Sequence, residues 1–458
     1  MTRVHDRPKE LEDPYSLSSL TTQEPPKETL AALQLIGPGL ILAGAIVGSG
    51  EMIATTVLGS ESGYSLLWLI VLSCLVKVVV QYELGRYAIA TGETTLEALN
   101  RIPGPRLGVA WPVWLWLLML TAIMFPVGGM LGAMGEILHR IYPPLSIFSW
   151  VWVIDGVTLA LLLAGRYGLI EKTSFVLVSI FTVVTVGAAF ILLSHPQYFS
   201  WADFGRGFLF QLPQGGLATA AAVFGATGVS AGELIMYPYW CIEKGYARHA
   251  GPNDGTSAWL RRVKGWSRVM GYDVGGSFVL YTFSTLAFYL LGAGVLARLA
   301  LAPEGAQMVD TLSKIFTETL GAWSLPLFLA GAVAVFYSSI FSATAAHGRL
   351  LADFAVQLGY CGRQDYRRRL LLTRVAIVAT LLTPTLCFFL VEEPVLMVKI
   401  GGVAQALMLP VIGFSTIYLG RQRLSDTLAP KGWIRLALWF SAVVMLAAAG
   451  YYLIATYL

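Results

Sequence analysis

Long apolar runs separated by short polar segments dominate the chain from residue 30 onward. A helix that crosses a bilayer needs about 20 consecutive apolar residues, and eleven runs approach or exceed that length. They are Leu30–Leu58, Ser65–Gln81, Trp111–Leu138, Ile147–Ala164, Phe175–Leu193, Leu217–Trp240, Val274–Leu291, Leu325–Phe341, Leu370–Leu390, Val395–Leu419 and Ile434–Leu458. The pattern predicts an all-α integral membrane protein with eleven transmembrane helices.

Two of these runs are interrupted by small residues and a glutamate. The first contains Gly48-Ser49-Gly50-Glu51, and the sixth contains Ser230-Ala231-Gly232-Glu233. Glycine weakens a helix and helps to free backbone carbonyls, and an ionisable side chain within a bilayer needs a partner or a wet cavity. We therefore expect helices 1 and 6 to be interrupted at these positions.

The two interruptions lie five spans apart, which is an odd number, so the two halves should cross the membrane in opposite senses. Interrupted helices at matching positions of two inverted halves indicate a substrate site near the bilayer midplane of a secondary transporter. We predict a disordered cytosolic tail, a first repeat of helices 1–5, a second repeat of helices 6–10 and one extra helix. Their expected ranges are residues 1–29, 30–193, 194–419 and 420–458.

Composition supports a membrane location, and the basic residues predict an orientation. The chain is 56% hydrophobic and 13% charged, whereas a soluble domain carries about 25% charged residues. If the N-terminus is inside, 25 Lys and Arg fall in segments on that side and five in segments on the other. The positive-inside rule then predicts a multi-pass protein of the plasma (cell inner) membrane with a cytoplasmic N-terminus and an outside C-terminus. Orientation and contact with anionic lipid explain the basic loops, so we expect no nucleic-acid partner.

The sequence offers little support for a membrane enzyme. It contains no H-E-x-x-H motif and no P-loop. The four cysteines are scattered, and we place the histidines in loops or at helix ends, too dispersed for a metal cluster. These histidines are His5, His139, His195, His249 and His347. We expect a monomeric transporter that is driven by gradients and holds no permanent cofactor.

The order of several short segments resembles the Nramp family of divalent-metal transporters, which belongs to the LeuT-fold superfamily. The matching segments are Gly37-Pro38-Gly39, Gly63–Trp68, Gln81-Tyr82, Ala90-Thr91-Gly92, Leu169–Lys172, Gly225-Ala226-Thr227, Tyr337-Ser338-Ser339, Thr373-Arg374 and Leu409-Pro410. The resemblance implies a LeuT-like fold, with a 5+5 inverted repeat, and transport of a divalent cation by alternating access.

The chain departs from the family at the metal-binding motifs. The family's Asp-Pro-Gly-Asn falls on Gly48–Glu51, and its Met-Pro-His-Asn falls near Val229–Gly232, so the methionine and histidine of that motif are absent. Carboxylates and carbonyls favour hard cations such as Mg²⁺ or Mn²⁺, and a divergent branch of the family resembles magnesium transporters. We expect Glu51 and Glu233 to bind the metal, surrounded by Gly48, Ser49, Gly50, Val229, Ser230, Ala231 and Gly232.

Other polar residues have two readings each. Gln405 and Ser338 could face the cavity, Gln405 as an oxygen ligand, or form hydrogen bonds between helices. Asp273 is either an acid of the inner gate or a helix N-terminal acid. Arg374 matches a basic residue that the family carries on helix nine, but its acidic counterparts are missing, so proton coupling stays open.

Two further basic segments, Lys77 and Arg367–Arg369, have simpler interpretations. Lys77, inside the second span, should pair with an acid or extend to the interface. The run Arg367-Arg368-Arg369 reads as an orientation signal.

The alternative function is a carrier of a small organic solute within the same superfamily. Half-helix N-termini can hold a substrate carboxylate, but Glu51 and Glu233 would repel one. A small organic cation, or an amino-acid-like solute recognised through its ammonium group, is therefore the version to consider.

Overall fold

A computed structural model describes residues 13–39, 48–164, 167–211 and 216–457 of the chain, and nearly all of its regular structure is helical. Eight spans within this part are long and apolar enough to cross a membrane. They are α4 (Leu67–Thr91), α6 (Trp111–Ile141), α10 with α11 (Leu217–Ala226 and Ala231–Glu243), α13 with η3 (Ser257–Leu291 and Gly292–Leu296), α15 (Ser324–Gln357), α16 (Tyr366–Val391), α17 (Pro394–Gln422) and α18 (Gly432–Tyr457).

Two further helices are apolar but shorter in their described parts. They are α7 (Ile147–Leu163) and the segment Val176–Leu192 of α8 (Tyr167–Leu192). The first span is described only in part, because residues 40–47 lie outside the described residues. Its described pieces are α1 (Thr29–Leu33), η2 (Ser49–Thr55) and α3 (Thr56–Ser62). Ten predicted spans thus coincide with helices, and the total of eleven stays a prediction.

The remaining elements are short and lie between the long helices. They are η1 (Ser19–Thr21), α5 (Thr95–Leu99), α9 (Trp201–Arg206), α12 (Tyr246–Ala250), η4 (Gly305–Gln307), α14 (Met308–Leu320) and a two-stranded hairpin of β1 (Arg106–Leu107) and β2 (Val109–Ala110).

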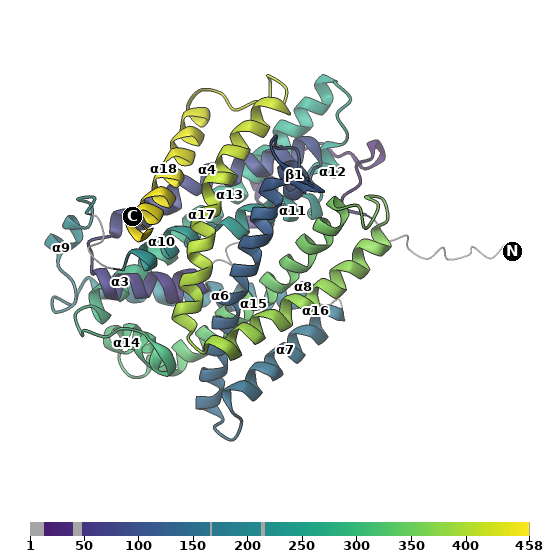
Figure 1. The fold of residues 1–458 in the computed structure, drawn as a ribbon. Coiled ribbons are helices and arrows are strands. Elements are labelled where there is room, and N and C mark those ends of the chain that lie inside the picture. The colour runs from purple at the N-terminus through teal and green to yellow at the C-terminus, as the bar shows by residue number, and fades with distance from the viewer. Residues whose placement is uncertain (1–12, 40–47, 165–166, 212–215, 458) are drawn as a thin grey trace.

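Helix packing follows the predicted inverted repeat (Figure 1). The third span, α6, packs on the tenth, α17, and the eighth, α15, packs on the fifth, α8. The third span corresponds to the eighth in the other half, and the tenth corresponds to the fifth, so the two pairs are equivalent in the predicted repeat. The pairs α6–α7 and α15–α16 are related in the same way, and α4 packs on α13, its counterpart in the other half. These contacts are those expected of two halves with the same fold.

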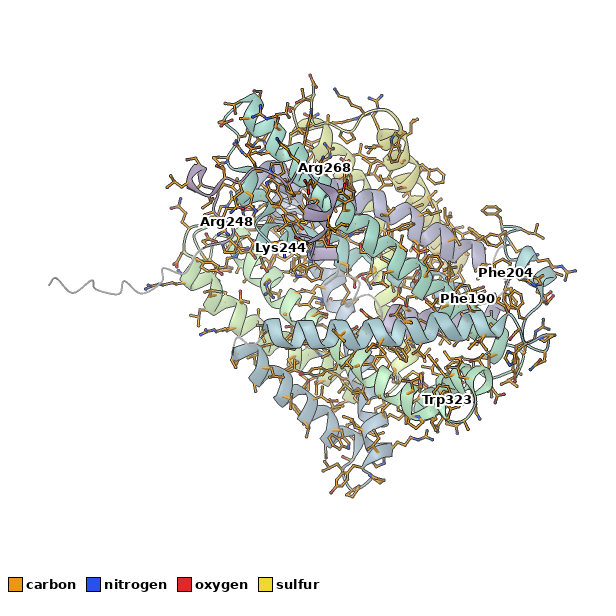
Figure 2. All side chains as sticks on the ribbon, turned by 180° about the vertical axis from the view of Figure 1, so that it is seen from behind. Phe190, Phe204, Lys244, Arg248, Arg268 and Trp323 are labelled. Atoms are coloured by element: carbon orange, nitrogen blue, oxygen red, sulfur yellow. The ribbon has the colours of Figure 1, made fainter. Side chains whose placement is uncertain are left out.

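The two ends of the helical bundle differ in charge. Figure 2 shows Lys244, Arg248 and Arg268 at one end, which we call the basic end, and Phe204 and Trp323 at the opposite end. This separation agrees with the uneven distribution of Lys and Arg on which the predicted orientation depends.

The described residues before the first span pack on the basic end. Tyr15 is 7% exposed, and its hydroxyl donates to Glu243 at 2.7 Å. Burial raises the pKa of the Tyr15 phenol well above its usual value, so the phenol stays neutral and donates this hydrogen bond. Further along, the Trp266 indole donates to the Gln23 carbonyl at 3.0 Å. Residues 13–29, part of the predicted disordered tail, therefore include well-anchored positions.

A buried ion pair joins α15 to α16 beside Tyr15. Arg369 donates to Asp353 at 2.9 Å, and its guanidinium lies 3.7 Å from the centre of the Tyr15 ring. Asp353 also accepts hydrogen bonds from the hydroxyls of Tyr239 and Thr94. Arg369 is therefore buried and paired, so it has a structural role in addition to the predicted orientation signal, which stays a prediction.

Replacing Arg369 by methionine is expected to destabilise the protein. The change leaves the Asp353 carboxylate buried without its cation, and breaking a buried pair from one side typically costs about 3–5 kcal/mol. The measurement is the midpoint of thermal unfolding in detergent. Arg367→Met is the control, because Arg367 is exposed and lies two residues before Arg369 on the same helix. Equal unfolding temperatures for the two variants would contradict the structural role of the pair.

Candidate substrate site between the interrupted helices

The sixth span is interrupted where the sequence predicts it. Helix α10 ends at Ala226 and α11 begins at Ala231. Gly228, between them, has a φ of +61°, a left-handed conformation that glycine adopts without strain. Ser230 caps α11 by accepting from the Glu233 N–H at 3.4 Å, and the Glu233 carboxylate accepts from the Ser230 N–H at 2.8 Å. This reciprocal capping box places Glu233 in the first turn of α11.

In the first span, Gly48 precedes a π-helical segment from Ser49 to Thr55, and Glu51 lies in the first turn of this segment. Residues 40–47 lie outside the described residues, so the interruption of the first span stays a prediction. A Cβ on Gly50 would lie 2.6 Å from the carbonyl oxygen of Ala226, so glycine at this position lets the first span pack directly on the interruption of the sixth. The two Gly- and Glu-containing segments singled out in the sequence are neighbours in the fold.

One peptide unit within the sixth-span interruption is held from both sides. The Gly228 N–H donates to Oε1 of Glu51 at 3.0 Å, and the Lys77 ammonium donates to the Thr227 carbonyl at 2.6 Å. The Thr285 hydroxyl of α13 also donates to Oε1 of Glu51, at 3.1 Å. Glu51 and Lys77 are both fully buried. A carboxylate and an ammonium are thus connected through a single peptide bond.

Lys77 takes neither of the positions expected of it. It forms no ion pair among the described residues, and it is fully buried, so it does not extend to the interface. Together with Ser73, one turn earlier on α4, it binds the end of α10, where Ser73 donates to the Phe224 carbonyl at 3.2 Å. The C-terminus of a helix carries a partial negative charge and attracts cations, which explains the position of the ammonium.

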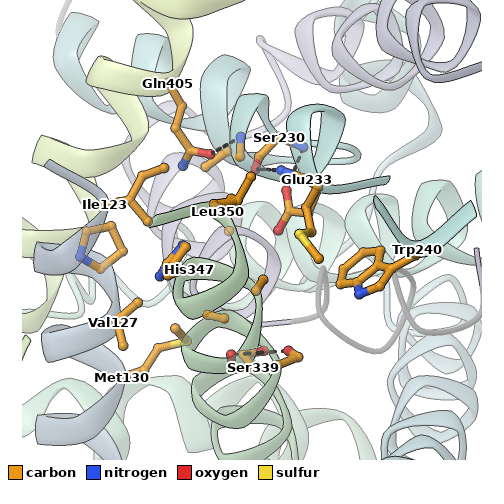
Figure 3. A pocket seen from close by; sticks show the side chains of 18 residues that line it. Ile123, Val127, Met130, Ser230, Glu233, Trp240, Ser339, His347, Leu350 and Gln405 are labelled. Atoms are coloured by element: carbon orange, nitrogen blue, oxygen red, sulfur yellow. Dashed lines mark hydrogen bonds between the residues drawn. The ribbon is translucent and has the colours of Figure 1, made fainter. Parts of the chain in front are cut away.

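A cavity lies where the first, third, sixth, eighth and tenth spans meet (Figure 3). Its volume is about 90 Å³, and its polar lining side chains are Ser230, Glu233, Ser339, Ser342, His347 and Gln405. Gly50, Ala226 and Gly232 line it from the two interruptions. Of the described residues that line the cavity, Glu233 and His347 are the ionisable ones.

The two glutamates occupy different environments. Glu233 lines the cavity, whereas Glu51 does not and bonds instead to Gly228 and to α13. Oε2 of Glu51 is buried and has no hydrogen-bond partner. No group of three or more His, Cys, Asp or Glu side chains that could hold a metal is present in the described part of the chain. A cation in the cavity would therefore depend on Glu233, neutral side chains, carbonyls and water.

The structure places the other predicted site residues as follows. Gln405 lines the cavity, and its Oε1 accepts from the Gly232 N–H at 3.2 Å, so it is bonded between helices. Val229 is buried within the interruption. Ser49 lies at the start of η2. Ser338 is buried on α15 and is not among the residues lining the cavity, while Arg374 is exposed on α16.

Asp273 lies in the middle of α13, so it is not an acid of its own helix terminus. It accepts hydrogen bonds from the Gly37 and Gly39 N–H groups and, at 3.0 Å, from the Tyr237 hydroxyl. The carboxylate thereby connects the Gly37–Gly39 segment to α13 and to α11.

Sequence reasoning missed His347. The expectation that it lies in a loop or at a helix end is wrong, because α15 runs from Ser324 to Gln357. The available signal was spacing: Ser339, Ser342, Ala346 and Leu350 recur every three or four residues and line the same cavity as His347.

Comparisons with known proteins identify relatives. An uncharacterized protein of Pasteurella multocida is 25% identical over 68% of this chain and 68% of its own length. The divalent metal cation transporter MntH of Mycobacterium tuberculosis is 28% identical over 66% of this chain, and the match spans 65% of its length, less than two thirds. A manganese transporter of Eremococcus coleocola, solved with an aromatic bis-isothiourea compound, matches with a TM-score of 0.68 at 19% identity over 95% of this chain and 90% of its own.

These matches bear out the predicted fold class and the family resemblance. The structural likeness confirms an all-helical, LeuT-like fold. The model of the natural resistance-associated macrophage protein-like family, Nramp, matches residues 39–455. This chain is a member of the Nramp family.

Proposed function

We propose that the protein transports a divalent metal cation across the plasma membrane by alternating access, with the cation bound in the cavity beside Glu233. The observation that carries this proposal is a carboxylate in a polar cavity where the interrupted sixth span meets the first span. The printed functions of two matches, a divalent metal cation transporter and a manganese transporter, support the same class of substrate.

The cavity suits a hard cation that keeps part of its water shell. Glu233, Ser230 and Gln405 offer oxygen atoms, and the interruptions expose backbone near them. A cavity of about 90 Å³ has room for several waters, because one water needs roughly 10–15 Å³ by the same kind of measure. Mg²⁺ and Mn²⁺ both accept oxygen ligands and bound water.

Glu51 and Glu233 have different roles in this proposal. Glu233 contacts the cation from the cavity wall. Glu51 contributes negative charge from behind the interruption, and its unpartnered Oε2 is available to a cation or water there. If both are ionised, the single charge of Lys77 offsets one of them, which leaves the unoccupied site with a net charge of −1 and favours cations.

Alternating access would rock one bundle of helices against the other around this site. With the basic end inside the cell, the bonds from Gly37 and Gly39 to Asp273 lie on the inner side of the site. We assign Asp273 to the inner gate, since motion of the inner part of the first span must break these bonds.

Replacing Glu233 by glutamine should reduce divalent-cation uptake at least tenfold, because it removes the charged ligand from the cavity. Glu51→Gln should reduce uptake less, since Glu51 does not line the cavity. Uptake of Mg²⁺, Mn²⁺ and Ca²⁺ into proteoliposomes measures both effects, with exposed Glu304→Gln as the control. Normal uptake by the Glu233 variant would overturn the proposed site, and uptake of a diamine but of no metal would favour the organic-cation alternative.

Replacing Lys77 by methionine should destabilise the interruption of the sixth span. The Thr227 carbonyl would lose a charged donor in a buried position, which costs about 2 kcal/mol, and Glu51 would lose its compensating charge. Thermal unfolding in detergent should show a lower midpoint than for Lys314→Met, which alters an exposed lysine on α14. An unchanged midpoint would mean that the ammonium does not hold the interruption together.

A further inference from the structure

His347 is the least expected side chain of the central cavity. It lies on α15, two turns after Ser339, and is 7% exposed. Figure 3 shows its ring within the group of side chains that line the cavity, which also includes Glu233 from α11 and Gln405 from α17. The imidazole therefore lines the same cavity as the carboxylate of the proposed substrate site.

Neither ring nitrogen of His347 has a hydrogen-bond partner among the described residues. The other buried polar side chains of the cavity do have such partners: Glu233 caps α11, Gln405 accepts from Gly232, and Ser342 donates to the Ser338 carbonyl at 2.8 Å. Buried polar groups are nearly always bonded, because an unmade hydrogen bond is costly. The His347 imidazole, which lines the cavity and has no protein partner among the described residues, is thus available for a ligand there.

The rest of the lining strengthens this reading. Met130 of α6 and Met236 of α11 also line the cavity, and their thioether sulfurs are soft donors. The motif of the sixth span has lost the methionine and histidine of the family pattern, yet the same two side-chain types reach this cavity from other positions. The preference of the site for softer or harder metal ions therefore depends on these side chains as well as on the two interruption motifs.

We propose that His347 binds the transported cation together with Glu233 and makes the site selective for Mn²⁺, or a similar first-row cation, over Mg²⁺ and Ca²⁺. This inference rests on the proposed function and refines its substrate class. Imidazole nitrogen is a good ligand for first-row transition cations, whereas Mg²⁺ and Ca²⁺ prefer oxygen and Mg²⁺ sheds its water reluctantly. Replacing one water or oxygen ligand by His347 would favour the transition cation and gain nothing for Mg²⁺.

The test compares Mn²⁺ and Mg²⁺ uptake by the same proteoliposomes for wild type, His347→Ala and His347→Gln. For His347→Ala we expect the apparent KM for Mn²⁺ to rise at least tenfold while that for Mg²⁺ changes less than twofold. The His347→Gln protein, which keeps a polar side chain of similar length, should show the same loss of Mn²⁺ preference and retain Mg²⁺ uptake. His195→Ala is the control, because His195 is partly exposed and does not line the cavity.

The outcomes separate this inference from the proposed function. Wild-type protein that moves no divalent cation would overturn the proposed function, and the role of His347 with it. Wild-type uptake with an unchanged Mn²⁺/Mg²⁺ ratio in both His347 variants would overturn the inference alone. A parallel loss of uptake of both ions in both variants would also overturn it, since that result indicates a structural role for the side chain.

Discussion

The peptide bond between Thr227 and Gly228 is the point on which the centre of this protein depends. Its N–H is bonded to a carboxylate of the first span and its carbonyl to an ammonium of the second span. An interrupted helix exposes backbone groups that cannot be left unbonded in a bilayer. Here two buried, oppositely charged side chains satisfy one peptide from both directions, and the interruption of the sixth span becomes compatible with a membrane interior.

This arrangement separates two glutamates that look equivalent in the sequence. Glu51 is part of the contact that holds the interruption, where it and Lys77 bond to the two ends of the same peptide group. Glu233 caps α11 and faces the cavity. The two halves therefore resemble each other in fold but differ in the chemistry of the centre. Glu51 bonds to protein groups, whereas Glu233 lines the cavity, where a ligand can reach it.

The basic end of the bundle is held by a second set of polar contacts. Asp273 ties the inner part of the first span to α13, while Arg369, Asp353 and Tyr15 join the N-terminal segment to α15 and α16. Few such bonds are needed, because buried charge-assisted hydrogen bonds are stronger than neutral ones. A conformational cycle that opens this end must exchange these bonds for others.

The sequence by itself determined the features that depend on local composition. Apolar runs located ten of the predicted spans, glycines beside an acid located the interruption of the sixth span, and the order of short segments indicated the family. These signals are local because bilayer thickness and backbone bonding act on each helix separately. Only the tertiary structure decided which side chains meet: Glu51 and Gly228 are 177 residues apart, and Lys77 binds a carbonyl that no spacing rule connects to it. The cavity setting of His347 likewise depends on how α15 is rotated against four other spans, and in a bundle with apolar residues on all sides that rotation is set by packing between helices.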